Sequence, residues 1–381
     1  MQEDIHIKLF DSEHVLIDKI YLYSIKITGI KDFPALIERG IIETIPSKKR
    51  QITLPGVPPF TSLRIEKTDF FDLFFCSVSK KGMFFSALEL SVRNPVNSSA
   101  KVAVCNLNCH TVYEVKLRVT LVQKNLLEMY GISTDMGSVL VKSIELNRTI
   151  RLEHGSFDTY LRSIALLMHL FSGKLRLTHG TEHAFLASPS RPLQAQTFER
   201  DSGKRGMKVK IYDKSAQLSA KGISTSESYL RYEVTLKSPS KVRGKLGTNY
   251  LWKLNNNILE QCFSDLFIAY WQPQYQKWKK ESQTFLQQTL LKKYRAGSHT
   301  WSRDVILEIY NDELQTGLPR MLALDALLQE LSILPFPRPQ DKYNAKKSLS
   351  SVCRSITSVY QRDDDIRMQE LILKLFHSQT A

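Results

Sequence analysis

Tyr212 is the residue of this chain whose type and surroundings best fit covalent chemistry. In the segment 207–214, two apolar residues alternate with Lys208, Lys210 and Tyr212, which is the period-2 pattern of a half-buried strand. The phenol would therefore leave the sheet on the same face as two ammonium groups. A phenol has a pKa near ~10, so it becomes a nucleophile when a base, a cation or a metal favours the phenolate. We expect Lys208, Lys210 and Lys214 to do so.

A second alternating run supplies a guanidinium and a carboxylate for the same sheet. In the segment 229–237 the apolar set begins at Leu230, so that Arg231 and Glu233 lie on the other face. If the two strands belong to one sheet, Tyr212, a carboxylate and several cations come together. These are the groups needed to cleave a phosphodiester and to hold one end covalently.

A further carboxylate, Glu145, lies on a strand predicted over 138–149. Its neighbours Ile144 and Leu146 face one way and Glu145 faces the other. Carboxylate oxygens are the ligands that Mg²⁺ and Mn²⁺ prefer, so Glu145 and Glu233 are candidate metal ligands. Such an ion would favour the phenolate and polarise the scissile phosphate. The residues alone leave open the alternative of a surface tyrosine among solvated lysines.

The composition fits a folded protein with an anionic partner. The chain of 381 residues is 42% hydrophobic and 24% charged, with a formal net charge of +15. Such a charge favours nucleic acid or an anionic membrane surface, although a basic surface without a polyanion stays open. No apolar run reaches the ~20 residues that span a bilayer, and the first residues include acids rather than a basic leader. The five cysteines are dispersed, so we expect a cytoplasmic protein with reduced thiols.

Several common catalytic motifs are absent from the sequence. It contains no phosphate-binding loop, dinucleotide-binding fingerprint or nucleophile elbow, so we do not expect ATP hydrolysis. It also lacks the His-hydrophobe-His pair with which many tyrosine nickases hold their metal. His179 and His183 fit the H-x-x-E-H pattern of inverted zinc proteases, but a glycine lies inside it. Cys105, Cys109 and His110 form a cluster that lacks the second half of a zinc site.

The order of the predicted elements indicates an α+β fold. A strand-rich mixed body with antiparallel sheets is followed by an all-helical C-terminal region. We expect three parts: the N-terminal strand-rich half (1–130), the catalytic half with Tyr212 and Glu233 (131–254), and a helical region that is a candidate for DNA binding (255–381).

Periodicity and turn chemistry define the individual elements. Besides the two runs around Tyr212 and Glu233, strands are predicted over 15–27, 63–65, 70–78, 83–92, 101–107, 112–121 and 138–149. Helices are predicted over 123–130, 156–171, 256–271, 275–294, 302–316, 319–333, 346–361 and 364–377. Gly131 is expected to end the first helix, and Ser156 to cap the second.

Basic and aromatic residues are interleaved in the helical region. The segments 271–280 and 291–295 combine both types, as a surface that stacks bases and neutralises phosphates would. Together with the strand lysines, the candidate DNA-binding residues are Lys208, Lys210, Lys277, Lys279, Lys280, Lys292, Lys293 and Arg295. The same spacing fits equally well a helix whose aromatic rings lie in a core and whose lysines lie on the solvated face.

The two alternating runs resemble the core of the filamentous-phage replication initiators, the nicking-closing proteins of rolling-circle synthesis. They are also similar to the initiators of rolling-circle plasmids. The resemblance rests on Lys-Ile-Tyr-Asp-Lys at 210–214 and Leu-Arg-Tyr-Glu-Val at 230–234. Looser similarities lie at 17–22 and 142–146. The resemblance covers residues 15–260, and the helical C-terminal region has no residue-level match.

The resemblance implies an initiator that nicks one strand of supercoiled origin DNA. Tyr212 would attack the phosphorus, keep a 5′-phosphotyrosyl bond and free a 3′-hydroxyl primer. Lys214 and Arg231 would stabilise the transition state, and Glu233 with Glu145 would hold Mg²⁺ or Mn²⁺. Glu145 stands where the family more often has aspartate.

The implied partners are origin DNA, both double-stranded and single-stranded, and the host replication helicase and polymerase. No membrane partner is expected. Two other functions fit the same residues: a non-enzymatic basic DNA-binding regulator, and a recombinase or transposase with phosphotyrosine chemistry. A metalloprotease built on His179 and His183 is a more remote alternative.

Overall fold

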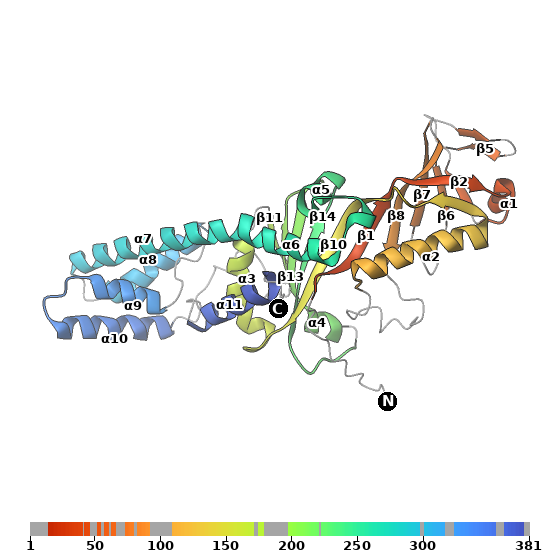
Figure 1. Cartoon of the computed structure of the whole chain (residues 1–381). Coiled ribbons are helices and arrows are strands. Elements are labelled where there is room, and N and C mark those ends of the chain that lie inside the picture. Colours follow the sequence, from red (N-terminus) through yellow and green to blue (C-terminus); the bar gives the residue numbers. More distant parts are fainter. Residues whose placement is uncertain are drawn as a thin grey trace.

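The molecule is elongated, with a central sheet between a strand-rich lobe and a lobe of long helices (Figure 1). The computed structural model describes residues 14–40, 42–45, 52–54, 57–60, 62–65, 73–79, 82–91, 109–170, 174–178, 197–220, 222–297, 301–316, 324–355 and 362–376. The strand predicted over 101–107, Cys105, and the motif of His179 and His183 lie outside these residues.

The predicted α+β class is confirmed, with antiparallel sheets followed by a largely helical C-terminal region. In the described part of the chain, the main sheet has the order β11-β12-β13-β14-β10-β1-β8-β7-β6-β3, and β2 pairs with β8 and β9. The strands are β1 (Leu16–Tyr23), β2 (Ile25–Ile30), β3 (Ile42–Ile45), β4 (Ile52–Leu54), β5 (Val57–Phe60), β6 (Ser62–Ile65), β7 (Leu73–Ser79), β8 (Gly82–Ser91), β9 (Ile132–Asp135), β10 (Leu140–Arg151), β11 (Lys174–Thr178), β12 (Thr197–Asp201), β13 (Met207–Asp213) and β14 (Tyr229–Leu236).

The helices include the predicted ones in order, together with short ones at 33–38, 214–219 and 239–246 that were not predicted, and two of them begin well before their predicted starts, at 112 and 339. They are α1 (Phe33–Glu38), α2 (Val112–Tyr130), α3 (Phe157–His169), α4 (Lys214–Ser219), α5 (Pro239–Leu246), η3 (Leu251–Lys253), α6 (Asn256–Leu266), η4 (Phe267–Trp271), α7 (Gln272–Ala296), α8 (Trp301–Thr316), α9 (Leu324–Ile333), α10 (Pro339–Ser355) and α11 (Arg362–Phe376). No helix of the described residues is long and apolar enough to cross a membrane.

The strand predicted over 112–121 is wrong, because these residues form the first half of α2. The sequence carries the signal for a helix start: Thr111 and Glu114 form a reciprocal capping box. Val115, Val119 and Val122 then recur at helical spacing and are buried. Gly131 ends the helix in the left-handed conformation, as predicted.

One face of the central sheet packs against helices, which leaves the other face for polar groups. The alternate residues of β14, from Leu230 to Leu236, are fully buried on the helix side. There the ring of Tyr232 meets Phe263 of α6 and Phe376 of α11 edge-on, each with centroids 5.2 Å apart. The alternation of β14 thus fixes which side chains point away from this core.

The far ends of the long helices form a second core. Leu286 and Leu290 of α7 pack with buried side chains of α8, α9 and α10. The proline-rich segment 334–339 joins α9 to α10, and Phe336 packs against this core. The last helix, α11, instead returns to the central sheet, where its residues Met368–Phe376 join the main core.

Candidate active site

Strand register brings the predicted residues to one face of the sheet. Tyr212 of β13 lies opposite Arg231 of β14, and Lys210 lies opposite Glu233. On the other side of β14, Glu145 of β10 lies opposite Thr235, two positions from Glu233. Because side chains alternate along each strand, the phenol, the guanidinium and both carboxylates point to the side of the sheet that is not covered by the core helices.

The hydroxyl of Tyr212 donates a hydrogen bond of 2.7 Å to Oε1 of Glu233. Both residues are buried, with exposed fractions of 4% and 6%. Burial raises the pKa of Tyr212, and the charge of Glu233 raises it further against the opposing effect of Arg231. The expectation that neighbouring lysines favour the phenolate is therefore wrong for the protein by itself: the phenol is held protonated, so that it would need a base in order to act as a nucleophile.

Lys210 bridges the two partners of this hydrogen bond. Its Nζ lies 4.1 Å from the centroid of the Tyr212 ring and 3.7 Å from Oε2 of Glu233. The ammonium thus contacts both the face of the ring and the carboxylate that holds the hydroxyl. Lys208, one step along the same strand face, lies 3.6 Å from Glu199 of β12.

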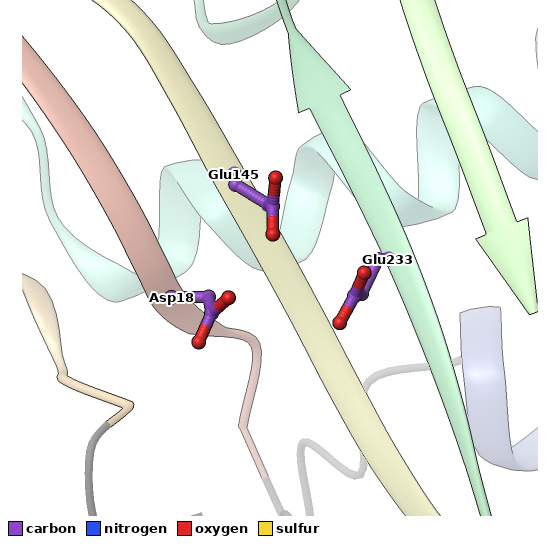
Figure 2. Close-up of side chains that lie close together, drawn as sticks. All are labelled: Asp18, Glu145 and Glu233. Carbon is purple, nitrogen blue, oxygen red and sulfur yellow. The ribbon is translucent and has the colours of Figure 1, made fainter. Parts of the chain in front are cut away.

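Three carboxylates converge on this face of the sheet (Figure 2), and one of them, Glu233, is the hydrogen-bond acceptor of Tyr212. Asp18 of β1, Glu145 of β10 and Glu233 of β14 each offer one oxygen, and these oxygens lie within 4.8 Å of one another. Burial raises the pKa of Glu145 to about 7, with further contributions from the charge of Glu233 and from a hydrogen bond and charge of Asp18. Three hard oxygen donors and a surplus of negative charge fit Mg²⁺ or Mn²⁺.

Asp18 was not among the predicted ligands, although it lies in the segment 17–22 that resembles the initiators. In the pairing of β1 with β10, Ile17 lies opposite Leu146 and Lys19 lies opposite Glu145. Asp18 is therefore the extra residue of a β-bulge, a device that re-aims side chains next to active sites. The feature of the sequence that could have identified Asp18 is an acidic residue within an otherwise apolar strand.

Arg231 and Lys214 are buried cations on the other side of Tyr212. Nε of Arg231 donates a hydrogen bond of 2.9 Å to Oγ1 of Thr149, whereas Nη2 is buried without a hydrogen-bond partner among the described residues. A buried donor left unpaired in the protein is suited to a ligand oxygen. Burial and the charge of Arg231 lower the pKa of Lys214 to about 7, and its Nζ contacts Oε1 of Gln217 at 2.7 Å.

Cys109 joins the carboxylate cluster rather than a site with His110. Its thiol lies 3.6 Å from Oδ1 of Asp18 and accepts a hydrogen bond of 3.3 Å from Nδ2 of Asn147. His110 instead lies 3.6 Å from Glu114. Burial raises the pKa of Cys109 and lowers that of His110 to about 4.

The structure contradicts the prediction that the aromatic residues of 271–280 form a base-stacking surface. Trp271 is fully buried and Trp278 is 3% exposed, and the Tyr275 ring stacks on Trp271 with centroids 4.6 Å apart. These rings recur at the 3.6-residue period of a helix and lie in the core, which was the alternative interpretation of the same pattern.

The lysines of this helix are solvated and partly neutralised. Lys277 lies 3.9 Å from Glu281, and Lys292 and Lys293 lie 3.3 and 2.8 Å from the two carboxylate oxygens of Glu308. Lys279, Lys280 and Arg295 are exposed on α7. Their role in DNA binding stays a prediction.

No family model matches the sequence, and no curated protein matches it. Among solved structures, the chain is similar to the rolling-circle replication initiator protein from Geobacillus stearothermophilus. The superposition has a TM-score of 0.28 and 10% sequence identity, and it covers 60% of this chain and 76% of that chain. The function proposed below therefore rests on the geometry of the site and not on this similarity.

Proposed function

We propose that this chain is a metal-dependent DNA-nicking and rejoining enzyme of rolling-circle replication, with Tyr212 as its nucleophile. The observation that carries the proposal is the hydrogen bond from the Tyr212 hydroxyl to Glu233, because Glu233 also belongs to the three-carboxylate cluster. One carboxylate thus joins a phenol to a site that is suited to a divalent cation. The net charge of +15 suits a phosphate-rich substrate.

Glu233 is placed to take the proton of the nucleophile. In the nicking step, Oη of Tyr212 bonds to phosphorus while the bond from phosphorus to the 3′ oxygen breaks. The phenolic proton passes to Oε1 of Glu233, with which it is already hydrogen-bonded. The departing 3′ oxygen needs a proton in turn, and Lys214, whose pKa is about 7, is suited to supply it.

Asp18, Glu145 and Glu233 would hold the cation. A bound Mg²⁺ or Mn²⁺ would polarise the phosphate and stabilise the phenolate after its proton has left. Burial is the main cause of the raised pKa of Glu145, and the negative charges of Glu233 and Asp18 in the same cluster raise it further.

Arg231 is suited to the charge that develops on the phosphate. Its free Nη2 and its position opposite Tyr212 place a fixed donor next to the nucleophile. Burial strengthens such a donor, because little water competes for the phosphate oxygen. Neighbouring anionic groups raise the pKa of Arg231 despite its burial, so it stays charged at any working pH.

The rejoining step reverses the same chemistry. A new 3′-hydroxyl attacks the phosphotyrosine, the bond from phosphorus to Oη breaks, and Tyr212 recovers its proton. The covalent bond conserves the energy of the phosphodiester, which fits a sequence without a phosphate-binding loop. The free 3′-hydroxyl made by nicking would serve a host polymerase as a primer.

The test is a nicking assay on supercoiled origin DNA with Mg²⁺, followed by denaturing gel analysis. The parent should yield relaxed circles that carry covalently bound protein. Tyr212→Phe removes one hydroxyl, so it should lose the adduct and keep DNA binding. A Phe variant that still forms the adduct would contradict the assignment of Tyr212, and a mobility shift without relaxation in the parent would indicate a DNA-binding regulator. Joining of two different DNA sites would indicate a recombinase.

A further inference from the structure

A basic and aromatic surface lies at the end of β14, apart from the Tyr212 site. Between Glu233 and Glu260 the chain has no acidic residue. The segment forms α5 and η3, which follow β14 directly and lie next to α6 (Figure 1). We call the surface formed by Lys241, Arg243, Lys245, Tyr250, Trp252, Lys253 and Tyr270 the α5 platform.

The cations of the α5 platform are not neutralised by the protein. Lys241, Arg243 and Lys253 are exposed and Lys245 is half-buried. Within the described residues, no carboxylate lies in ion-pair distance of any of these four side chains. The lysines of α7 differ, because Lys292 and Lys293 share Glu308. Positive potential is therefore concentrated at α5.

Exposed aromatic rings lie among these cations. Tyr250, Trp252 and Tyr270 are 47%, 38% and 45% exposed, far more than a buried core ring. Nζ of Lys245 lies 3.5 Å from the centroid of Tyr270, and Nζ of Lys253 lies 5.5 Å from that of Tyr250. Lys245 also lowers the pKa of Tyr270, with a smaller effect from Lys241. Two of the three rings thus have an ammonium group against them.

The backbone holds the rings in place. The segment that bears Tyr250 and Trp252 is tied to the start of β10: Asn249 O accepts from Val141 N at 2.7 Å. The indole of Trp252 donates a hydrogen bond of 2.6 Å to Met136 O. Rings that are fixed before binding lose little conformational entropy when a ligand stacks on them.

Tyr270 belongs to a rare helical element. It lies in η4, a π-helical turn between α6 and α7 in which Trp271 is buried and Tyr270 is 45% exposed. Such turns are uncommon in helices and occur frequently at functional sites. The exposed ring of Tyr270 lies under the ammonium group of Lys245 of α5.

We propose that the α5 platform binds single-stranded DNA next to the nicking site, with bases stacked on Tyr250, Trp252 and Tyr270 and phosphates held by the four cations. Unpaired bases expose their faces to aromatic rings, whereas a duplex hides them. From Arg231, opposite Tyr212, to Lys237 β14 spans roughly 20 Å, and the segment that bears the platform begins beyond that end of the strand. This role rests on the proposed nicking function.

The test measures binding separately from chemistry. In the full-length Tyr212→Phe background, a fluorescent oligothymidine of about 20 nucleotides, longer than the site of one single-strand-binding fold, is titrated by anisotropy. Tyr250→Ala and Tyr270→Ala should each weaken binding about 5- to 50-fold, with unchanged melting temperature. Tyr250→Phe and Tyr270→Phe keep the ring and should bind like the parent.

A charge variant and a matched control complete the test. Lys245→Gln should lower the slope of log affinity against log salt by about 0.7, whereas Lys124→Gln, at an exposed lysine of α2 that pairs with Glu128, should leave it unchanged. The proposal is overturned if the alanine variants bind as tightly as the parent, if Lys124→Gln has the larger effect, or if anionic vesicles but not the oligonucleotide respond to these changes.

The two proposals fail in different ways. If the parent protein binds the oligonucleotide through the α5 platform but never forms an adduct, the platform proposal stands and the nickase proposal is rejected. If the platform variants nick and bind like the parent, the nickase proposal stands and the platform proposal is rejected.

Discussion

The hydroxyl of Tyr212 donates its hydrogen bond to Glu233, a residue that also lies within a cluster of three carboxylates. The same side chain can therefore accept the phenolic proton and ligate a cation. Both roles require an ionised carboxylate. Lys210 lies 3.7 Å from the second oxygen of Glu233, so the protein itself supplies a positive charge next to this carboxylate.

Glu233→Gln should lose at least about 100-fold in nicking rate, since an amide cannot accept the phenolic proton. Oligonucleotide binding should be unchanged or tighter, because one negative charge is removed. Single-turnover rates across a Mg²⁺ titration measure the effect. Glu199→Gln is the control, since Glu199 pairs with Lys208 on the neighbouring strand. A Glu233→Gln rate that still rises with Mg²⁺ as in the parent would exclude its role as a ligand.

Glu145→Gln should stabilise the protein without metal. The folded-state pKa of Glu145 is raised from 4.5 to about 7. Between these values the folded state keeps a proton on Glu145 that the unfolded state has lost, so stability falls as pH rises through that window. Above pH ~7 the ionised carboxylate should cost about 1–3 kcal/mol, which glutamine avoids.

The same variant should lose the stabilisation that a bound cation gives. Melting temperatures at about pH 8, above the raised pKa, with EDTA and then with Mn²⁺, separate the two effects. Equal responses of the parent and Glu145→Gln to Mn²⁺ would show that the cluster does not bind the ion.

Much of the site was predictable from the sequence, because it depends on strand alternation. The period-2 pattern of β13 and β14 placed Tyr212, Arg231 and Glu233 on one face, and antiparallel pairing brought them together. What alternation cannot predict is a break in the register. Asp18 of the cluster is the extra residue of the bulge in β1, and Tyr270, whose ring contacts Lys245, lies in the π-helical turn η4.

The α2 helix was mispredicted for a different reason. Its β-branched residues, among them Val115 and Val119, favour a strand locally, and they are buried on one helical face. The capping box of Thr111 and Glu114 and the packing of that face outweigh this preference. Burial of this helical face against distant parts of the chain therefore decided between a strand and a helix.

Lys214→Met should remove a pH dependence of stability. The pKa of Lys214 is lowered from 10.5 to about 7, so between these values the unfolded state binds more protons, and stability rises with pH. The buried charge should cost a few kcal/mol, on the order of 2–4, below pH ~7. Lys214→Met should therefore be more stable than the parent at about pH 6 and nearly equal above about pH 10.

Chemical denaturation at these two pH values measures the difference. Lys142→Met, a substitution of an exposed lysine on β10, is the control and should show no such trend. A constant difference between parent and Lys214→Met at both pH values would mean that Lys214 stays charged when the protein folds.

Asp18→Asn tests the ligand that strand alternation did not reveal. An amide oxygen is a weaker ligand than a carboxylate, and affinity depends on ligand charge, so Mn²⁺ should bind at least about tenfold more weakly. Calorimetric titration with Mn²⁺ in the absence of DNA measures this without relying on activity. Asp265→Asn, on the exposed face of α6, should bind Mn²⁺ like the parent. If Asp18→Asn also binds like the parent while Glu145→Gln does not, two carboxylates hold the ion, and the bulge of β1 orients Asp18 for its contact with Cys109 instead.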